Sequence, residues 1–531
     1  MKTFLWQLGI ASALFAIPAV VPAWSQSSPA PVMSDRAAAR LLDQATWGPT
    51  PASIQQLQGL GINAWLQSQF SAPVSDLPDQ PQLDSAGKTN TDLTPVQSAF
   101  FQNTLTGQDQ LRQRVAFALS EIWVASAVSV RPAYAFPPYW RIFRDNAFGN
   151  YRDIIKAVTL SPAMGNYLNM ANNNKANTKK GTAANENYAR ELQQLFTIGL
   201  VQLNPDGSQV LDSNNNPVPT YNQAEVTNTA RALTGWTYPT APGATAKNNN
   251  PAYYFGQMIP VESEHDTTAK TVIGGIQIPA GQTAEQDLDS LLDALMQQST
   301  MAPFVSSQLI QHLVTSNPSP QYIQRVSSVF TNDGTGTTGN MQAVITAILT
   351  DPEARAGDDL NAPPNPNFGH MREPVLFMAN LLRGLNATLG SSSAIYNQTN
   401  QMGQKLFYPA SVFSYFSPQY RTQAGATPGL LGPEFQIYST ATAAARADIV
   451  NSILYGTLDK STQFDLSGFN AFSANTAALV DDISYTFFYH GMSSNLQQAV
   501  TKAASAATSP QKAAQAALYV ALTSGEYQIV H

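Results

Sequence analysis

Residues 185–199 read NENYARELQQLFTIG, and this stretch carries the pattern that decides the fold. Its apolar side chains recur at helical spacing and form one face, made of Tyr188, Leu192, Leu195 and Phe196. Asn185 is a preferred residue for capping a helix N-terminus, and the carboxylate of Glu186 is favourable in the first turn. The stretch therefore predicts an amphipathic helix over residues 185–198.

Capping residues followed by apolar side chains at helical spacing also occur before and after this helix in the chain. Ser34 precedes a helical repeat at residues 35–46, and Thr50-Pro51 combines a capping residue with a proline at the first helical position. Further helices are expected at residues 63–70, 111–123, 151–160, 223–235, 284–296, 303–314, 319–330, 341–349, 372–385, 442–454, 476–489, 496–508 and 510–522, and one more begins at Thr94-Pro95.

Strand patterns are fewer. Residues 200–204 and 209–212 flank a turn with the sequence NPDG, which predicts a β-hairpin, and residues 253–258 and 270–278 are expected to form a second one. The expected fold class is therefore mainly α: a single large multi-helix domain over residues 34–531 with one or two small β-hairpins.

The N-terminus has the order of a secretory signal peptide. Lys2 precedes an apolar run over residues 4–21, and Ala23 and Ser25 supply the small residues that a signal peptidase reads. Cleavage is expected near Ser25, although an uncleaved N-terminal membrane anchor is the alternative. No other long apolar run follows, so no membrane span is expected after signal removal, and the expected location is periplasmic or secreted.

Composition excludes several classes of function. The chain of 531 residues contains no Cys, which rules out disulfides, thiolate metal sites and cysteine nucleophiles. Its 28 basic and 35 acidic residues give a net charge of −7, which argues against a nucleic-acid partner because phosphate binding needs a basic surface. The triplet of glycines at Gly334, Gly336 and Gly339 follows a predicted helix rather than a strand, which favours a turn over a dinucleotide site.

Two polar clusters are candidates for chemistry. On the helix over residues 185–198, Glu186 and Arg190 are i,i+4 partners, while Glu191 lies at the margin of the apolar face and is expected to be half-buried. A second cluster, ESEHD at residues 262–266 with Lys270 nearby, could provide acid–base groups or help to bind a divalent metal. The alternative for both clusters is an ion-pair network that only fixes the fold.

An aromatic, proline-broken segment covers residues 407–421. Aromatic faces stack on sugar rings, which would suit a polysaccharide or cell-envelope ligand, but packing of this segment onto the helices is the favoured interpretation. His312 is interpreted as a hydrogen-bonded core histidine, since it lies on a predicted helix beside apolar residues.

Several of these motifs together resemble the bacterial domain-of-unknown-function 1800 family. The strongest is NENYAREL followed by LFTIG at residues 185–199, and ARALTGW at residues 230–236 and His265-Asp266 with Lys270 and Gly274 also fit. Three later motifs agree with the family as well, and they are REP at residues 372–374, PASVF at residues 409–413 and PEFQ at residues 433–436. Glu373 and Glu264 are not clear family positions. The resemblance implies an exported bacterial protein of unassigned activity, with an exported sulfatase- or phosphatase-like protein as a possible partner.

The candidate site combines the two clusters with the end of the helix at residues 230–236. The candidate catalytic residues are Glu191, His265, Asp266 and Lys270, and the candidate ligand-binding residues are Arg190, Arg231 and Trp236. Gly235 allows a tight helix end, which is expected to expose the Trp236 indole to a cleft.

Two functions stay open at this point. One is a hydrolase-like or metal-assisted enzyme acting on extracellular polymer or cell-envelope material. The other is a non-catalytic binding or scaffold protein that works with the exported partner.

Overall fold

The computed structural model describes residues 33–363, 365–391, 393–422, 429–472 and 474–530. Within this part of the chain there are twenty-two α-helices and only two-stranded sheets, which confirms the expected mainly α fold. None of the helices in these ranges is long and apolar enough to cross a membrane. The predicted signal peptide, residues 1–25, lies outside the described residues.

The helices fall into three consecutive groups along the chain. The first group is α1 (Asp35–Ala45), α2 (Pro51–Leu60), α3 (Ile62–Phe70), α4 (Thr94–Thr106), α5 (Gln110–Ile122), α6 (Phe136–Asn146), α7 (Tyr151–Thr159) and α8 (Pro162–Tyr167). The second is α9 (Asn187–Glu191), α10 (Gln223–Ala232), α11 (Ala284–Met296), α12 (Met301–Leu313), α13 (Pro320–Thr331), α14 (Met341–Thr350) and α15 (Pro352–Arg355). The third is α16 (Pro374–Gly384), α17 (Tyr396–Gln401), α18 (Thr440–Leu454), α19 (Ser467–Phe472), α20 (Thr476–Phe488), α21 (Ser494–Ser505) and α22 (Pro510–Leu522).

Short elements connect these helices. A π-helix, η2 (Leu192–Thr197), continues α9, and the 3-10 turns are η1 (Ala133–Ala135), η3 (Glu262–Glu264), η4 (Ile273–Gly275), η5 (Ala356–Asp358) and η6 (Pro433–Ile437). The strands are β1 (Trp236–Thr237), β2 (Ile259–Pro260), β3 (Lys270–Thr271), β4 (Gln277–Ile278), β5 (His370–Met371), β6 (Thr388–Leu389), β7 (Thr462–Gln463) and β8 (Ile529–Val530). They pair antiparallel as β1–β2, β3–β4, β5–β8 and β6–β7.

Local capping explains why many helices begin where the sequence predicts. The Ser34 side chain accepts a hydrogen bond from the backbone N–H of Ala37 at the start of α1. At α2, the Thr50 side chain and Ser53 form a reciprocal capping box, and Pro51 occupies the first turn. The helix expected at residues 284–296 has those bounds in α11, where Thr283 and Gln286 form another capping box.

The predicted β-structure is partly wrong. Residues 200–219 form a meander held by isolated bridges such as Leu203↔Gln209 and Leu211↔Pro217. The Leu203↔Gln209 bridge joins the two segments of the first predicted hairpin. The second predicted hairpin is wrong in its pairing: residues 270–278 fold back on themselves as β3 and β4, and residues 253–258 do not pair with them. The reason is a turn through Gly274 and Gly275, whose positive φ angles reverse the chain within the predicted strand.

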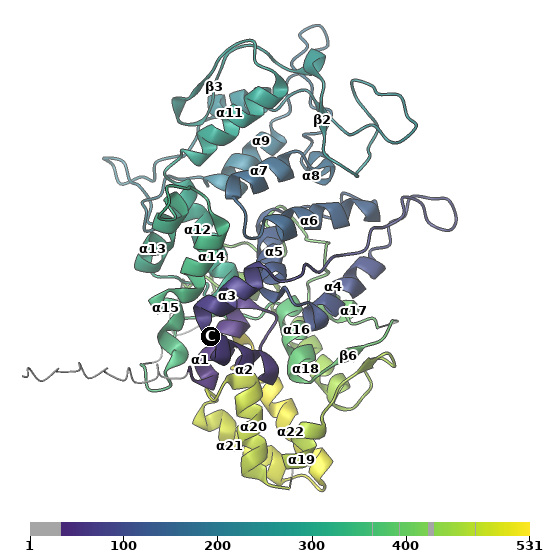
Figure 1. Ribbon diagram of the computed structural model, residues 1–531, viewed down its shortest axis with the longest axis vertical. Helices are drawn as coiled ribbons and strands as arrows, with labels where there is room; N and C mark the ends of the chain where they lie inside the picture. The colour runs from purple at the N-terminus through teal and green to yellow at the C-terminus, as the bar shows by residue number, and fades with distance from the viewer. Residues whose placement is uncertain (1–32, 364, 392, 423–428, 473, 531) are drawn as a thin grey trace, which may run out of the picture.

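Figure 1 shows the chain as an elongated stack of helices. Helices α7, α9 and α11 lie at one end, α5, α6 and α12 to α14 in the middle, and α19 to α22 at the other end. One contiguous cluster of buried apolar side chains runs from Ala38 to Tyr527. In its middle part, the rings of Trp123 and Phe196 stack with centroids 4.5 Å apart and join the end of α5 to the π-helix.

A buried polar network ties the beginning of the chain to its end. Arg372 is 2% exposed and donates to the carbonyl oxygens of Tyr527 (2.6 Å) and Ile529 (2.9 Å) and to the carboxylate of Asp43 on α1. Asn380 on α16 donates to Asp43 at 3.2 Å and accepts from the Tyr527 hydroxyl at 2.7 Å. These contacts place α1, α16 and β8 side by side.

The single domain over residues 34–531 stays a prediction, and limited proteolysis tests it. The exposed loops at residues 205–219 and 239–251 are expected to be cut first, because their backbone lies largely in solvent. The fragments should then co-elute on size-exclusion chromatography, since the buried core spans both sides of each cut. Separation of two folded fragments after one cut would contradict the prediction.

Candidate functional site

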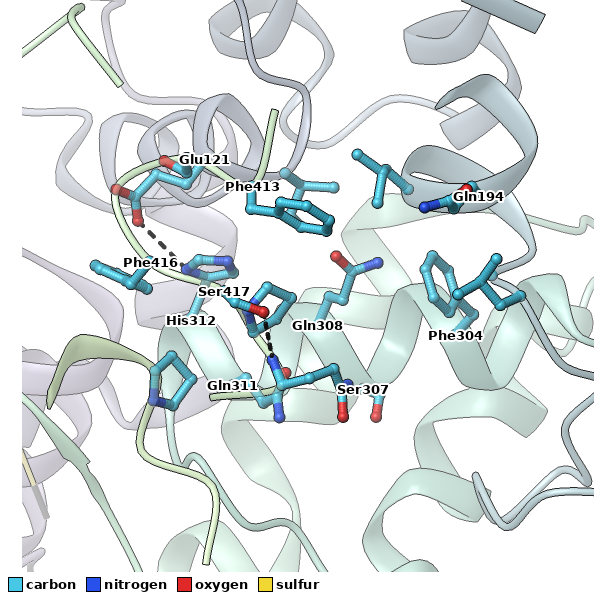
Figure 2. Close-up of a pocket in the computed structure, with 18 of the residues that line it drawn as sticks. Glu121, Gln194, Phe304, Ser307, Gln308, Gln311, His312, Phe413, Phe416 and Ser417 are labelled. Carbon is cyan, nitrogen blue, oxygen red and sulfur yellow. Dashed lines mark hydrogen bonds and ion pairs between the residues drawn. The ribbon is translucent and has the colours of Figure 1, made fainter. Parts of the chain in front are cut away.

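A cavity with a volume of about 460 Å³ lies where α5, the π-helix, α12 and the loop 412–419 meet. Figure 2 shows the side chains that line it: Glu121 and His312 lie together at one side, and Phe304 and Gln194 lie at the other. Cavities of this size with a few polar groups among apolar walls are typical ligand sites. We call it the Glu121 pocket.

Glu121 is the titratable group that decides the chemistry of this pocket. It lies in the last turn of α5 and its side chain is 2% exposed. Burial raises the pKa of Glu121 to about 7. Glu373, Arg114 and Gln404 act in the opposite direction but do not cancel the effect of burial. A carboxyl group with this pKa is half protonated near neutral pH and can both donate and accept a proton there.

Glu373 lies behind Glu121 and forms a buried pair of carboxyl groups with it. The side-chain amide of Gln404 donates to Glu121 Oε1 at 3.0 Å and to Glu373 Oε2 at 2.5 Å, so one amide holds both carboxyl groups. Burial, followed by the charge of Glu121, raises the pKa of Glu373 well above its usual range. The two carboxyl groups lie within hydrogen-bond reach of each other, with Glu373 as the protonated partner.

Arg114 and His312 complete the environment of this carboxyl pair. Arg114 is fully buried and lies about two helical turns before Glu121. It donates to the backbone carbonyl of His312. His312 Nδ1 lies 3.4 Å from Glu121 Oε2, and burial lowers the pKa of this imidazole. His312 is therefore a close neighbour of the carboxyl pair rather than a permanent cation, and Glu121 Oε2 has no hydrogen-bond partner among the described residues.

A second carboxylate, Glu434 on η6, also lines the pocket. Its Oε1 lies 3.1 Å from His370 Nδ1, and both side chains are almost fully buried. Glu434 Oε2 and His370 Nε2 have no hydrogen-bond partner within the described part of the chain. Buried polar atoms without partners are costly and are common where a ligand or water completes the site.

The remaining walls combine aromatic rings with amide groups. Phe304, Phe413 and Phe416 line the pocket together with Gln194, Gln308 and Gln311. Phe413 is 43% exposed although it belongs to the pocket wall, whereas Phe407 packs against Phe136 with ring centroids 5.9 Å apart. Part of the aromatic segment therefore packs onto helices, as favoured from the sequence, and part lines the cavity; binding of a sugar by these rings stays a prediction.

The predicted second cluster forms a buried ion-pair network. His265 Nε2 and Lys270 Nζ both contact Asp287 Oδ2, at 3.1 and 2.6 Å, and all three side chains are fully buried. Gly235, with φ 85°, allows the end of α10 to approach this loop, because a Cβ there would lie 2.9 Å from His265 Cβ. Asp287 on α11 was not predicted, since it looks like an ordinary first-turn acid of that helix.

Arg231 and Asp266 form a separate ion pair beside this network, and Lys270 Nζ also donates to the backbone carbonyl of Asp266. Arg231 donates to Asp266 at 2.8 Å; burial raises the pKa of Asp266, but the hydrogen bonds from Arg231 and Thr268 lower it overall. The expected exposure of the Trp236 indole is wrong: the ring is 2% exposed, because β1 pairs with β2 and covers it.

Arg190 and Glu191 lie on α9, which packs against α10. Arg190 contacts Glu186 at 3.1 Å, as the i,i+4 spacing predicts, and also Gln223 at the start of α10. Glu191 is half-buried, as expected, and burial raises its pKa. The three predicted segments therefore do pack together, but their charged groups divide into separate sets. A catalytic or ligand-binding role for these residues stays a prediction.

No group of three or more His, Asp or Glu side chains is arranged to hold a metal ion anywhere in the ranges that the structure describes. The possible divalent metal stays a prediction.

The residues of the Glu121 pocket were largely missed by sequence reasoning. Arg114 and Glu121 are charged residues off the apolar face of a predicted helix that also contains Arg112, so their charge alone does not single them out. Glu373 and Glu434 lie far along the chain, in REP and PEFQ motifs that contain no recognisable catalytic spacing. Only the fold brings α5, α12, α16 and η6 to one place.

The motif resemblance is borne out by comparison with known families. The model of DUF1800, a protein family of unknown function, matches residues 40–529. The chain belongs to the DUF1800 family. Neither the curated proteins nor the solved structures yield a match. For this DUF1800 protein, function must therefore be argued from the site itself.

The buried Asp287 network makes a prediction about stability. Asp287→Asn should lower the free energy of unfolding by about 3–5 kcal/mol, because it leaves Lys270 buried without its counter-charge. Asp293→Asn on the same helix is the matched control: its pair with Arg152 is exposed, and the loss should stay below about 1 kcal/mol. Urea unfolding measures both, and equal losses would contradict the prediction.

The raised pKa of Glu121 predicts how stability depends on pH. Between its ordinary value of 4.5 and its folded value of about 7, the folded protein binds more protons than the unfolded chain. The free energy of unfolding should therefore fall as pH rises through this window, by up to about 3 kcal/mol from this group. Glu121→Gln should flatten the fall, so that the variant gains stability relative to the parent between pH 5 and pH 8.

Urea unfolding at four pH values between 5 and 8 measures this difference. Glu285→Gln, an exposed substitution at the start of α11, is the control and should leave the profile unchanged. Parallel profiles for the parent and the Glu121 variant would show that Glu121 does not carry the shifted proton.

Proposed function

We propose that this DUF1800 protein is an exported hydrolase that cleaves glycosidic bonds in extracellular polymer or cell-envelope material, with Glu121 as its general acid. The observation that carries the proposal is a buried carboxyl group with a pKa of about 7 on the wall of the 460 Å³ pocket. Glycoside hydrolysis needs one carboxyl group protonated near neutral pH and a second carboxylate nearby.

Glu434 is the second carboxylate in this proposal. It lines the same pocket, and His370 holds its Oε1 while Oε2 is without a partner among the described residues. Glu121 donates a proton to the leaving oxygen as the glycosidic bond breaks, and Glu434 accepts a proton from the attacking water. One water molecule is consumed, and the proton that Glu121 loses is matched by the proton that Glu434 gains. Glu373 is a positioning residue, since it reaches the pocket only through Glu121.

The pocket walls support a sugar as the substrate. The rings of Phe304, Phe413 and Phe416 offer faces on which a pyranose can stack, and the amides of Gln308 and Gln311 offer donors and acceptors for its hydroxyl groups. Gln308 Nε2 is a buried donor without a partner within the described ranges, and a substrate hydroxyl would satisfy it.

Release of reducing ends from soluble oligomers of glucose and of N-acetylglucosamine tests the proposal. Glu121→Gln should lower kcat by about 100-fold or more, because the amide cannot protonate the leaving oxygen. Gln308→Ala should raise KM more than it lowers kcat, and Glu285→Gln is the control. For the parent, kcat should fall as pH rises above about 7, where Glu121 loses its proton.

Two outcomes would overturn the proposal. One is full activity in the Glu121 variant. The other is saturable binding of these sugars without cleavage and unchanged by Glu121→Gln, which would favour the non-catalytic binding or scaffold protein that works with an exported partner.

A further inference from the structure

A second cavity, with a volume of about 360 Å³, lies between α1 and the junction of α20 and α21, on helices of the end of the stack opposite α11 (Figure 1). Its walls also include Arg372 directly after β5, Glu526, and Ile529 of β8. Three of its lining residues are arginines: Arg36, Arg40 and Arg372. No residue of the Glu121 pocket takes part in it.

The arginines of this cavity are only partly neutralised. Arg40 pairs with Asp358, and Arg372 pairs with Asp43. Arg36 instead donates to two carbonyl oxygens, those of Gly357 at 2.8 Å and Tyr489 at 3.1 Å. Burial, followed by the charge of Arg40, lowers the pKa of Arg36, which is the response expected of a cation held beside another cation.

One of the arginines that line the cavity, Arg40, has a donor without a hydrogen-bond partner among the described residues. Arg40 is 1% exposed, and its Nε has no hydrogen-bond partner in the described parts of the chain. The carboxylate that also lines the cavity, Glu526, accepts from the backbone N–H of Ser493 at 3.0 Å and from its hydroxyl, so it is engaged at the start of α21. Arg40 also lines the cavity, so its buried charge acts on any group held there and favours an anion.

The backbone around the cavity is held in an uncommon conformation. Tyr489 and His490 are consecutive non-glycine residues with φ angles of 55° and 60°. This turn directs the Tyr489 carbonyl to Arg36 and places the Tyr489 hydroxyl 3.4 Å from Arg372 Nη2. Left-handed conformations at non-glycine residues cost energy and are concentrated at ligand sites.

We propose that this cavity binds an oxyanion, a phosphate, sulfate or carboxylate group carried by a small ligand, and that Arg36 and Arg40 hold it. Planar guanidinium groups match the oxygen atoms of such groups in pairs, which an ammonium group does not. The cavity exceeds the size of one oxyanion, so it accommodates the rest of the ligand as well. The site is separate from the Glu121 pocket, and its occupancy does not depend on hydrolysis.

Binding of simple anions to the purified protein tests the proposal. Sodium phosphate, sodium sulfate and sodium glucuronate are titrated by calorimetry, with sodium chloride at equal ionic strength as the reference. At least one of the three should bind saturably and raise Tm above the chloride value. The three arms show which oxyanion is preferred.

Arg36→Gln should weaken this binding by about tenfold or more, because it removes the guanidinium that has no carboxylate partner. Arg152→Gln, which removes an exposed arginine of α7, is the matched control and should bind like the parent. If Arg36→Gln does not fold, Arg36→Lys keeps the charge without the planar fork and should still bind more weakly than the parent.

The proposal is overturned if none of the anions binds more strongly than chloride. It is equally overturned if the folded Arg36 variant binds phosphate, sulfate and glucuronate with the affinity of the parent.

Discussion

The buried contact of Arg372 with Asp43 is the interaction on which the rest of the structure depends. Arg372 is fully buried, so its charge has lost its hydration and is retained only because Asp43 and two main-chain carbonyls replace the water. These acceptors come from α1 and from the last residues of the chain. The constraint therefore fixes three segments at once: the first helix, the start of α16 and β8.

The same constraint positions both candidate sites. Glu373 follows Arg372 directly and begins α16, so the contact that fixes Arg372 also fixes the carboxyl group behind Glu121. On the other side, Arg372 forms part of the wall of the arginine cavity and contacts Tyr489. Two adjacent side chains thus support two sites that face different parts of the molecule, and neither site is built on a flexible loop alone.

The sequence predicts the helices well because their signals are local. Ser34, Thr50 and Thr283 cap the helices that follow them, and each cap depends only on residues within one turn. The predicted sheet pairing of residues 253–258 fails because Gly274 and Gly275 turn the chain earlier. The Glu121 pocket was missed for a different reason. Glu121, His312, Glu373 and Glu434 come from four distant segments, and nothing in their local sequence reports that they meet.

The charge balance at the Glu121 pocket explains why a proton must be shared there. Glu121, Glu373 and Glu434 are all buried, and two arginines act on them: Arg114 on all three carboxyl groups and Arg446 on Glu373. Ionising all three carboxyl groups would still be costly, because buried charges lose their hydration and like charges repel. Protonating Glu373, which is farthest from the cavity, removes one charge, and its hydrogen bond to Glu121 keeps the proton within reach. The buried environment thus raises the pKa values of Glu121 and Glu373, and this effect depends on how distant segments pack rather than on the local sequence.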